Sequence, residues 1–307
     1  MSQFPSFPIL TEAQMRARLA PPSARVRMVL DTDTANEVDD QFALVYAMLS
    51  PERLDVEAMY AAPFDNEKSN GPADGMEQSY QEIVRLLAQL EVAPEGFVYR
   101  GATRYLPSVD APVESEAVRD LIARAKAGPA PLYVVAIGAI TNIASALLLA
   151  PEIVDRIVVV WLGGHASHWP HNREFNLQQD PLSARVLFDA GVPLIRVPCY
   201  PVASHMLTTA PELERYVQGE SAIGDDLVAL FKAYHEDHYA WAKEIWDLAA
   251  VAYLVAPEWV KSALVPSPML NEDLTWTHDG GRHLVREAQW VNRNAIFRDL
   301  FDKLALQ

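Results

Sequence analysis

The segment PLYVVAIGAITNIASALLLA (131–150) contains an apolar run, a turn-forming stretch and a second apolar run, and it ends before Pro151. A membrane-spanning helix needs about 20 predominantly apolar residues, whereas this segment is interrupted at Gly138, Thr141 and Asn142. The segment therefore predicts a buried strand, a turn and a helix.

Apolar blocks of the same kind recur along the chain, at 25–30, 55–60, 156–162 and 192–197. Segments with helical periodicity lie between them, at 39–49, 79–90, 114–128, 141–150 and 180–191. Continuous apolar strands that alternate with helices are typical of a parallel sheet covered on both faces. We therefore expect an α/β fold, with a doubly wound, mostly parallel sheet and helices on both faces.

The pattern changes after residue 210. It predicts long helices over 211–256, short alternating segments over 262–287 and a last helix over 291–305. Because no Gly/Ser-rich or Pro-rich linker divides the chain, we expect one domain over residues 1–307.

The charge balance excludes several classes of partner. The 307 residues include 25 Lys and Arg against 41 Asp and Glu, a net charge of −16 with His neutral. Nucleic acids and anionic membrane surfaces repel so acidic a chain, and we expect neither as a partner. The start of the sequence shows no basic segment followed by an apolar run, so we expect no signal peptide and predict a cytoplasmic location.

An acidic cluster directly follows the first predicted strand, in DTDTANEVDD (31–40), which holds five carboxylates in ten residues. Asp39 and Asp40 have a structural explanation, because acids favour the N-terminus of a helix. Asp31 and Asp33 do not, since they follow an apolar strand at the sheet edge where open α/β folds bind ligands. Crowded carboxylates repel each other unless a cation lies among them, and Ca²⁺ or Mg²⁺ takes oxygen ligands. The cluster therefore predicts a divalent metal site.

Further polar groups lie near the ends of predicted strands or the starts of predicted helices. Ile137 ends a strand, so its carbonyl could face the same sheet edge. Glu174 and Asn176 lie in the loop after the next strand, and Trp246-Asp247 precedes a helix. Each has an ordinary alternative: loop polarity for Glu174 and Asn176, core packing for Trp246 and a helix N-cap for Asp247.

In this order, the motifs DTD…DD, AIG-x-x-TNIA, GG…EFN…DP and WD-x-x-AVAYL resemble those of the inosine–uridine nucleoside hydrolases. The resemblance covers about residues 26–256 and also fits the tail. It implies a doubly wound sheet with one Ca²⁺ at the bottom of a deep pocket, hydrolysis of ribonucleosides to free base and ribose, and a homodimer or homotetramer.

The resemblance also implies roles for individual residues. Asp33 matches the acid that binds Ca²⁺ and acts as general base on the attacking water, and the other metal ligands match Asp40, Asp247 and the carbonyl of Ile137. The residues that match substrate contacts are Asp39, Asn66, His168, Glu174, Asn176 and Trp246. Among them, the groups that match contacts to the ribose hydroxyls are Asp39, Glu174 and Asn176. Such a ring of carboxylates stabilises the oxocarbenium-like state through which an N-ribosidic bond is cleaved.

The sequence departs from the family pattern in two places. Members commonly have three residues between DTD and the Asp-Asp pair, whereas this chain has five, Thr34 to Val38, so the loop must bulge before Asp39. Many members have a His before the last metal Asp, as proton donor to the leaving base, and here that position is Trp246. An indole can stack on a purine, which predicts a purine preference. Alternatively, Trp246 packs the wall, and His168 or another histidine of its loop supplies the proton.

Three other interpretations remain at this point. DTD (31–33) also resembles the nucleophile motif of haloacid-dehalogenase-like phosphatases, although the late acidic motif of that family should follow a strand, and GDD (224–226) leads into a predicted helix. A nucleoside-binding protein without turnover is the non-enzyme alternative, but binding alone does not need Asp33 as a base. Two sets of spaced histidines could bind zinc: His165, His168 and His171, and His235 and His238.

Overall fold

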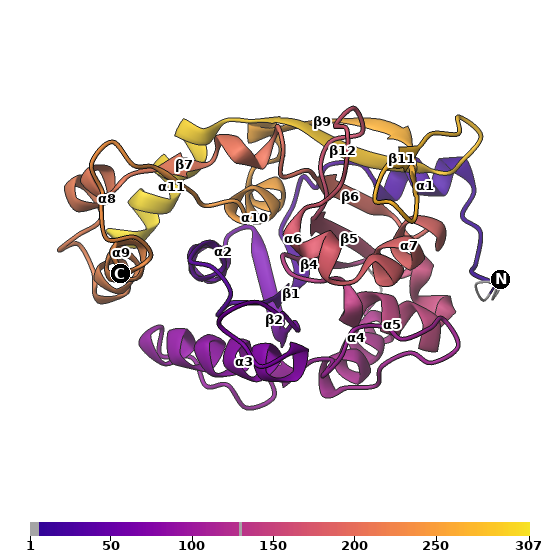
Figure 1. Ribbon diagram of the computed structural model, residues 1–307, viewed down its shortest axis with the longest axis horizontal. Helices are drawn as coiled ribbons and strands as arrows, with labels where there is room; N and C mark the ends of the chain where they lie inside the picture. The colour runs from indigo at the N-terminus through magenta and orange to yellow at the C-terminus, as the bar shows by residue number, and fades with distance from the viewer. Residues whose placement is uncertain (1–5, 129–130) are drawn as a thin grey trace.

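A computed structural model describes residues 6–128 and 131–307. Its centre is an eight-stranded sheet with the order β3-β2-β1-β4-β5-β6-β12-β9 (Figure 1). Neighbouring strands pair in parallel, except that β9 runs antiparallel to β12 at one edge. The strands of this sheet are β1 (Val26–Thr32), β2 (Leu54–Ala61), β3 (Val98–Arg100), β4 (Leu132–Ala136), β5 (Ile157–Leu162), β6 (Leu194–Val197), β9 (Val260–Pro266) and β12 (Leu284–Val291). The predicted α/β fold with a mostly parallel, doubly wound sheet is confirmed.

Helices cover both faces of the sheet. The first face packs against α2 (Asp39–Met48), α3 (Pro72–Gln89), α10 (Leu248–Val255) and α11 (Arg293–Leu304). The second packs against α4 (Glu116–Ala127), α5 (Thr141–Leu149) and α7 (Pro181–Asp189). Alternate strand residues supply the two cores: Met28 and Leu30 of β1 belong to the first, and Val29 to the second. Every residue of β4 and β5 is buried, as expected of central strands between two helical layers.

The remaining helices and strands are mostly short. They are α1 (Glu12–Arg18), α6 (Phe175–Gln179), α8 (Ala210–Tyr216), α9 (Ala222–Ala233) and two strand pairs, β7 (Leu207–Thr208) with β8 (Lys243–Glu244) and β10 (Met269–Leu270) with β11 (Trp276–Thr277). The longest of them, α9, has 12 residues. In Figure 1, α8, α9 and the end of α11 lie at the opposite end of the molecule from the amino terminus.

Two details differ from the sequence prediction. The segment 211–256 was expected to form long helices, but α8, α9 and α10 have 7, 12 and 8 residues, and an irregular stretch over 234–242 separates the last two. Strand β3 was not predicted, because three residues are too few to show a period.

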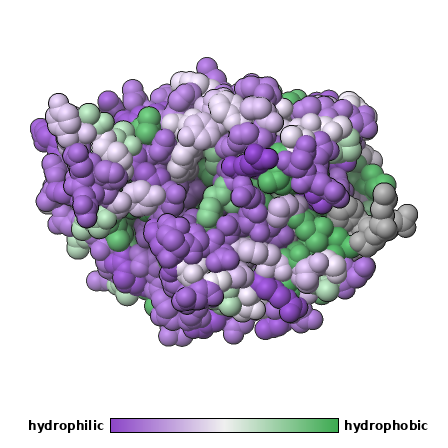
Figure 2. Space-filling view, in the orientation of Figure 1, coloured by the Kyte–Doolittle hydropathy of each residue, from purple (hydrophilic) through white to green (hydrophobic). Residues whose placement is uncertain are grey.

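The surface is mostly hydrophilic on the face shown in Figure 2, where hydrophobic residues form small patches between polar areas. Within residues 6–128 and 131–307, no helix combines the length and apolar character that crossing a membrane requires.

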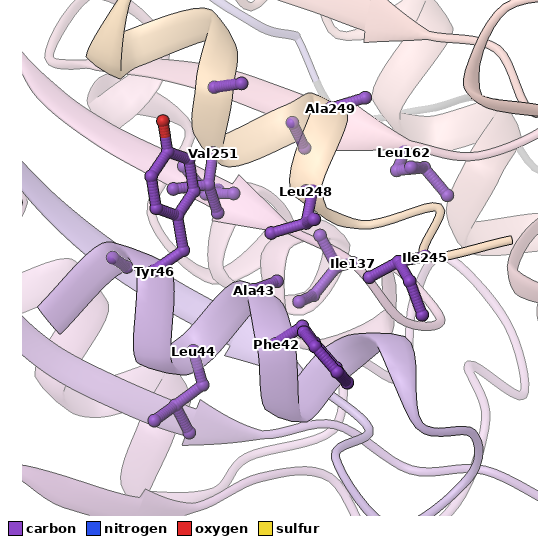
Figure 3. Packing of buried hydrophobic residues seen from close by; sticks show 14 of the residues in the cluster. Phe42, Ala43, Leu44, Tyr46, Ile137, Leu162, Ile245, Leu248, Ala249 and Val251 are labelled. Atoms are coloured by element: carbon purple, nitrogen blue, oxygen red, sulfur yellow. The ribbon is translucent and has the colours of Figure 1, made fainter. Parts of the chain in front are cut away.

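Apolar packing between α2 and α10 determines where the acidic residues lie. All eight residues of α10 are buried, and its Leu248 and Val251 lie close to Phe42 and Tyr46 of α2 in the same core (Figure 3). Ile137 and Leu162, from the ends of β4 and β5, belong to this packing as well (Figure 3). Burying each large apolar side chain contributes about 1.5–3 kcal/mol, so this contact holds the two helix N-termini firmly over the sheet edge.

Candidate active site

A cavity of about 470 Å³ lies beyond the carboxyl ends of β1, β4, β5 and β6. The order of the sheet reverses between β1 and β4, and a crevice at such a reversal is where open α/β sheets bind ligands. The predicted site residues that line this cavity are Asp33, Asp39, Asp40, Ile137, Glu174, Asn176, Trp246 and Asp247.

Four aspartates from three separate segments meet in the cavity, and we call Asp33, Asp39, Asp40 and Asp247 the acidic cluster. Asp33 follows β1, Asp39 and Asp40 open α2, and Asp247 occupies the N-cap position of α10. One carboxylate oxygen from each of Asp39, Asp40 and Asp247 lies within 4.8 Å of the other two. The side chain of Asp247 makes no capping hydrogen bond to α10, so helix capping does not account for it. These three carboxylates could bind a metal ion together.

The acidic cluster has carboxylate oxygens without partners. Among the described residues, neither oxygen of Asp33 nor Oδ1 of Asp39 has a hydrogen-bond partner, and all three atoms are buried. Burial raises the pKa of Asp33, Asp40 and Asp247 well above the ordinary range, and the neighbouring acids raise it further. Burial, followed by the charge of Glu37, raises the pKa of Asp39 to about 6. Buried, unpartnered oxygens that repel each other fit a hard cation, because such an ion provides both a partner and the opposite charge.

Asp31 has a structural role. Its Oδ2 accepts a hydrogen bond from Nδ2 of Asn142 at 2.8 Å, and burial raises its pKa to about 7. The same Asn142 donates to the carbonyl of Ala61 and accepts from the amide of Ala102. The first Asp of the DTD motif and the Asn of the TNIA motif therefore tie β1 and α5 to β2 and to the segment after β3.

One lysine neutralises part of the acidic cluster. The ammonium of Lys243 donates to Oε2 of Glu37 at 2.5 Å and lies 5.0 Å from the ring centroid of Tyr234. Burial alone would lower the pKa of Lys243, but the charges of Asp39 and Glu37 raise it, so this side chain stays cationic. Glu37 belongs to the longer loop between DTD and the Asp-Asp pair, and the ion pair fixes this loop to β8.

Asn176 and Ile137 are linked at the edge of the acidic cluster. Nδ2 of Asn176 donates to the carbonyls of Ile137 and Leu162, both at 3.0 Å. Both amide protons are therefore used, and Oδ1 is left to accept a hydrogen bond from a ligand hydroxyl. The carbonyl of Ile137 keeps a second lone pair for a cation.

Glu174 organises the loop after β5. Its carboxylate accepts hydrogen bonds from the amides of Gly164, Asn176 and Leu177, at 2.7, 3.0 and 3.0 Å. Burial raises the pKa of Glu174, and these three bonds oppose that rise. Gly164 has a φ of 68°, a conformation that favours glycine, and the turn there directs the next residue, His165, into the cavity.

Aromatic rings line another part of the cavity, and we call His165, Trp169, His171, Tyr200 and Trp246 the aromatic cluster. The rings of Trp169 and Tyr200 stack with centroids 5.5 Å apart, and Tyr200 also contacts Trp246 edge-on at 5.4 Å. The imidazole of His165 lies 5.3–5.8 Å from the rings of Tyr200, His171 and Trp169. A planar aromatic ligand can stack on such a surface.

Two predicted substrate contacts do not line this cavity. His168 is exposed, while His165 and His171 of the same loop line the cavity in its place. Asn66 lies in a neighbouring depression, where its Nδ2 donates to Oδ1 of Asn36 at 2.7 Å.

Three further residues at or beside the cavity, Cys199, Tyr200 and Lys243, were not predicted from the sequence. Cys199 and Tyr200 line the cavity just after β6, so the rule that ligands bind beyond the carboxyl ends of strands would have identified them. Lys243 gives no comparable signal, because its contact with Glu37 joins residues far apart in the sequence.

Comparisons with known proteins agree with this geometry. The family model described as inosine-uridine preferring nucleoside hydrolase matches residues 28–295. The chain belongs to this family. The predicted resemblance is confirmed, and so is the prediction that the protein is an enzyme, a hydrolase of nucleosides.

Individual relatives are similar over most of their length. The chain is 26% identical over 257 residues to the non-specific ribonucleoside hydrolase RihC of Salmonella schwarzengrund, covering 77% of this chain and 80% of the relative. It is 29% identical to RihC of Escherichia fergusonii, covering 76% and 80%.

Two solved structures share the fold. They are a plant nucleoside hydrolase, PpNRh1 (TM-score 0.72, 21% identity, 93% of this chain and 100% of that one), and a purine-preferring ribonucleoside hydrolase from Gardnerella vaginalis (TM-score 0.73, 22% identity, 91% and 98%).

The GDD motif (224–226) and the histidine pair at 235 and 238 have structural roles in the fold. Asp225 and Asp226 lie in α9 and do not follow a strand, and Asp226 pairs with Arg85 at 2.9 Å. This placement removes the support for a phosphatase of the haloacid dehalogenase type. His235 and His238 pack on the ring of Trp241, with centroids 5.0 and 5.6 Å away.

Proposed function

We propose that this protein hydrolyses the N-ribosidic bond of ribonucleosides with the help of Ca²⁺. One observation carries the proposal: buried carboxylates from the end of β1 and from the starts of α2 and α10 converge in one cavity, and Asp33 has no hydrogen-bond partner there among the described residues. Binding of nucleosides alone would not need Asp33 as a general base, and titratable groups with strongly shifted pKa values in a cavity are typical of catalytic sites.

We propose Asp33, Asp40, Asp247 and the carbonyl of Ile137 as the ligands of Ca²⁺. Asp40 and Asp247 belong to the three carboxylates that lie within 4.8 Å of one another, and we assign the third of them, Asp39, to the ribose. Calcium takes six to eight oxygen ligands in flexible geometry, whereas magnesium prefers a tight octahedron and keeps several waters. An open set of protein oxygens, with space for ligand hydroxyls beside it, suits calcium better. When bound, the ion would polarise the attacking water and offset the repulsion among the carboxylates.

The protein groups then have distinct tasks. Asp33 accepts the proton of the attacking water as general base, because its carboxylate lines the cavity and neither of its oxygens has a hydrogen-bond partner among the described residues. Asp39, Glu174 and Asn176 bind the ribose hydroxyls, Asn176 as an acceptor through Oδ1. The negative charge of the acidic cluster stabilises the cationic ribose as the bond to the base breaks.

The aromatic cluster supports a preference for purines. Trp246 directly precedes Asp247, so its ring lines the cavity beside the proposed metal and ribose site. A purine offers a larger surface for stacking than a pyrimidine, and stacking on an aromatic side chain is worth about 1–3 kcal/mol per base.

A panel of ribonucleosides, followed by chromatography of the free base with and without a chelator, tests the proposal. We expect release of base from inosine, adenosine or guanosine, slower release from uridine and cytidine, and loss of turnover after chelation that added Ca²⁺ restores. Tight binding without any release of base would contradict it. A cytoplasmic location and a homodimer or homotetramer stay predictions.

A further inference from the structure

The His165 side chain is held in one orientation inside the cavity. It is 5% exposed, and its Nδ1 accepts a hydrogen bond from the backbone amide of Tyr200 at 3.3 Å. An imidazole that accepts at Nδ1 carries its proton on Nε2 when it is neutral. Among the described residues, no group hydrogen-bonds to Nε2, so this N–H is available to a ligand in the cavity.

The backbone of His165 is fixed as firmly as its ring. Its carbonyl accepts from Nη1 of Arg196 at 2.9 Å and from Nε1 of Trp276 at 3.3 Å, and its amide donates to Oδ1 of Asn172 at 2.9 Å. The fully buried Arg196 is itself paired with Glu287 on β12. The imidazole is therefore oriented before any ligand arrives, as a group that stabilises a transition state should be.

The surroundings keep the imidazole neutral. Burial, followed by the charges of His171 and Arg196, lowers the pKa of His165 to about 4. At neutral pH the ring can therefore donate a hydrogen bond but has no extra proton to give away. This property separates a hydrogen-bond donor from a general acid.

We propose that the Nε2–H of His165 donates a hydrogen bond to the leaving base. This role rests on the proposed function. Many family members have a histidine at the position of Trp246, and His165 would provide the hydrogen-bond donor to the base that Trp246 does not. The bond between C1′ and the base nitrogen breaks, and its electron pair stays on the base. The water oxygen bonds to C1′ and its proton goes to Asp33, while the base, stabilised by His165, takes its own proton from solvent.

Two substitutions test the two ring nitrogens of His165 independently. In His165→Asn the amide oxygen can replace Nδ1 as acceptor, but the donor at Nε2 is lost. In His165→Gln the amide nitrogen reaches the position of Nε2 and restores a donor that is not an acid. His205→Asn is the matched control, because His205 is exposed and lies outside the cavity lining.

Each variant is assayed on inosine and on 4-nitrophenyl β-ribofuranoside, whose leaving group needs no hydrogen bond because nitrophenolate is already stable. We expect His165→Asn to lower kcat on inosine about 10²- to 10³-fold, as expected for one lost donor, and to change kcat on the nitrophenyl riboside only slightly. His165→Gln should recover most of the loss, and His205→Asn should behave like the unmodified protein.

Other outcomes would overturn the proposal. An equal loss of kcat on both substrates would show that His165 contacts the ribose and not the base. An unchanged kcat on inosine would show that His165 has no role in the reaction. A fold check by circular dichroism and melting temperature shows whether a lost activity reflects the donor or the fold. If the unmodified protein cleaves neither substrate, the proposed function fails, which is distinct from failure of the role of His165.

Discussion

The acidic cluster and the aromatic cluster line the same cavity but are stabilised in opposite ways. In the acidic cluster, carboxylate oxygens of Asp33 and Asp39 are buried without partners among the described residues, and like charges repel. In the aromatic cluster, the backbone and ring of His165 are held by Tyr200, Arg196 and other groups. The difference supports the proposed ion in the acidic cluster, where it would balance the charge, whereas the protein itself supplies the hydrogen bonds that hold His165 in the aromatic cluster.

The largest effect should come from Asp33. Asp33→Asn keeps an oxygen for a metal ion but cannot accept a proton, so we expect turnover of inosine to fall about 10²–10⁴-fold, the usual contribution of a general base. Calcium binding, measured by isothermal titration calorimetry, should persist. Asp33→Ala should lose turnover and weaken calcium binding together, and near-normal turnover in Asp33→Asn would disprove the role as base.

Without the metal, the carboxylates of the acidic cluster should repel each other, so the stability of the protein should depend on pH. The folded pKa of Asp39 is about 6, and the pKa values of Asp33, Asp40 and Asp247 are raised well above the unfolded value near 4. The stability from bound protons is therefore lost as the pH rises through these folded values. The effect of His165 on stability has the opposite dependence on pH. Its pKa is about 6.5 in the unfolded chain and about 4 in the folded protein, so this residue lowers the stability of the fold as the pH falls below about 6.5. Above pH 6.5 the acidic cluster therefore dominates.

We expect the Tm of the chelated protein to fall between pH 6.5 and pH 8, and added Ca²⁺ to raise Tm more at pH 8 than at pH 6.5. Differential scanning calorimetry with and without chelator measures both. Asp33→Asn provides the control, because it removes one repelling charge and should flatten the decline. A Tm of the chelated protein that does not change over this range would mean that the acids are not coupled as the structure indicates.

The acidic cluster was predictable from the sequence, whereas the aromatic cluster was largely not. Asp33 directly follows an apolar strand and Asp40 begins a periodic helix, so short-range patterns place both at one edge of the sheet. Spacing alone favoured His168, but the turn at Gly164 directs His165 into the cavity and leaves His168 exposed. The partners that fix this loop, Arg196 and Trp276, come from distant segments that no local pattern connects to it.

Trp246→Ala should have a moderate effect on activity, because it removes a contact to the base and leaves the metal site unchanged. Loss of one stacking surface worth about 1–3 kcal/mol predicts a decrease of roughly tenfold in kcat/KM for inosine. Uridine, with the smaller ring, should lose less, and calcium binding should not change. Unmodified protein that cleaves uridine as fast as inosine would rule out the purine preference on which this prediction depends.

The smallest effect should come from Lys243, which compensates part of the charge of the acidic cluster without lining the cavity. Lys243→Met removes the cation beside Glu37 and Asp39, so the chelated protein should become less stable. The same change should tighten calcium binding by roughly fivefold, because about 1 kcal/mol of repulsion between the ammonium and the ion disappears.

Lys261→Met is the matched control, since this exposed lysine packs on Trp290 at the sheet edge and should leave calcium binding unchanged. Calorimetric titration of calcium into the chelated variants measures the difference. Weaker calcium binding in a folded Lys243→Met protein would show that the ion pair with Glu37 acts mainly by holding the loop before Asp39 in place. The acidic cluster would then depend on preorganisation by the protein, as the aromatic cluster does.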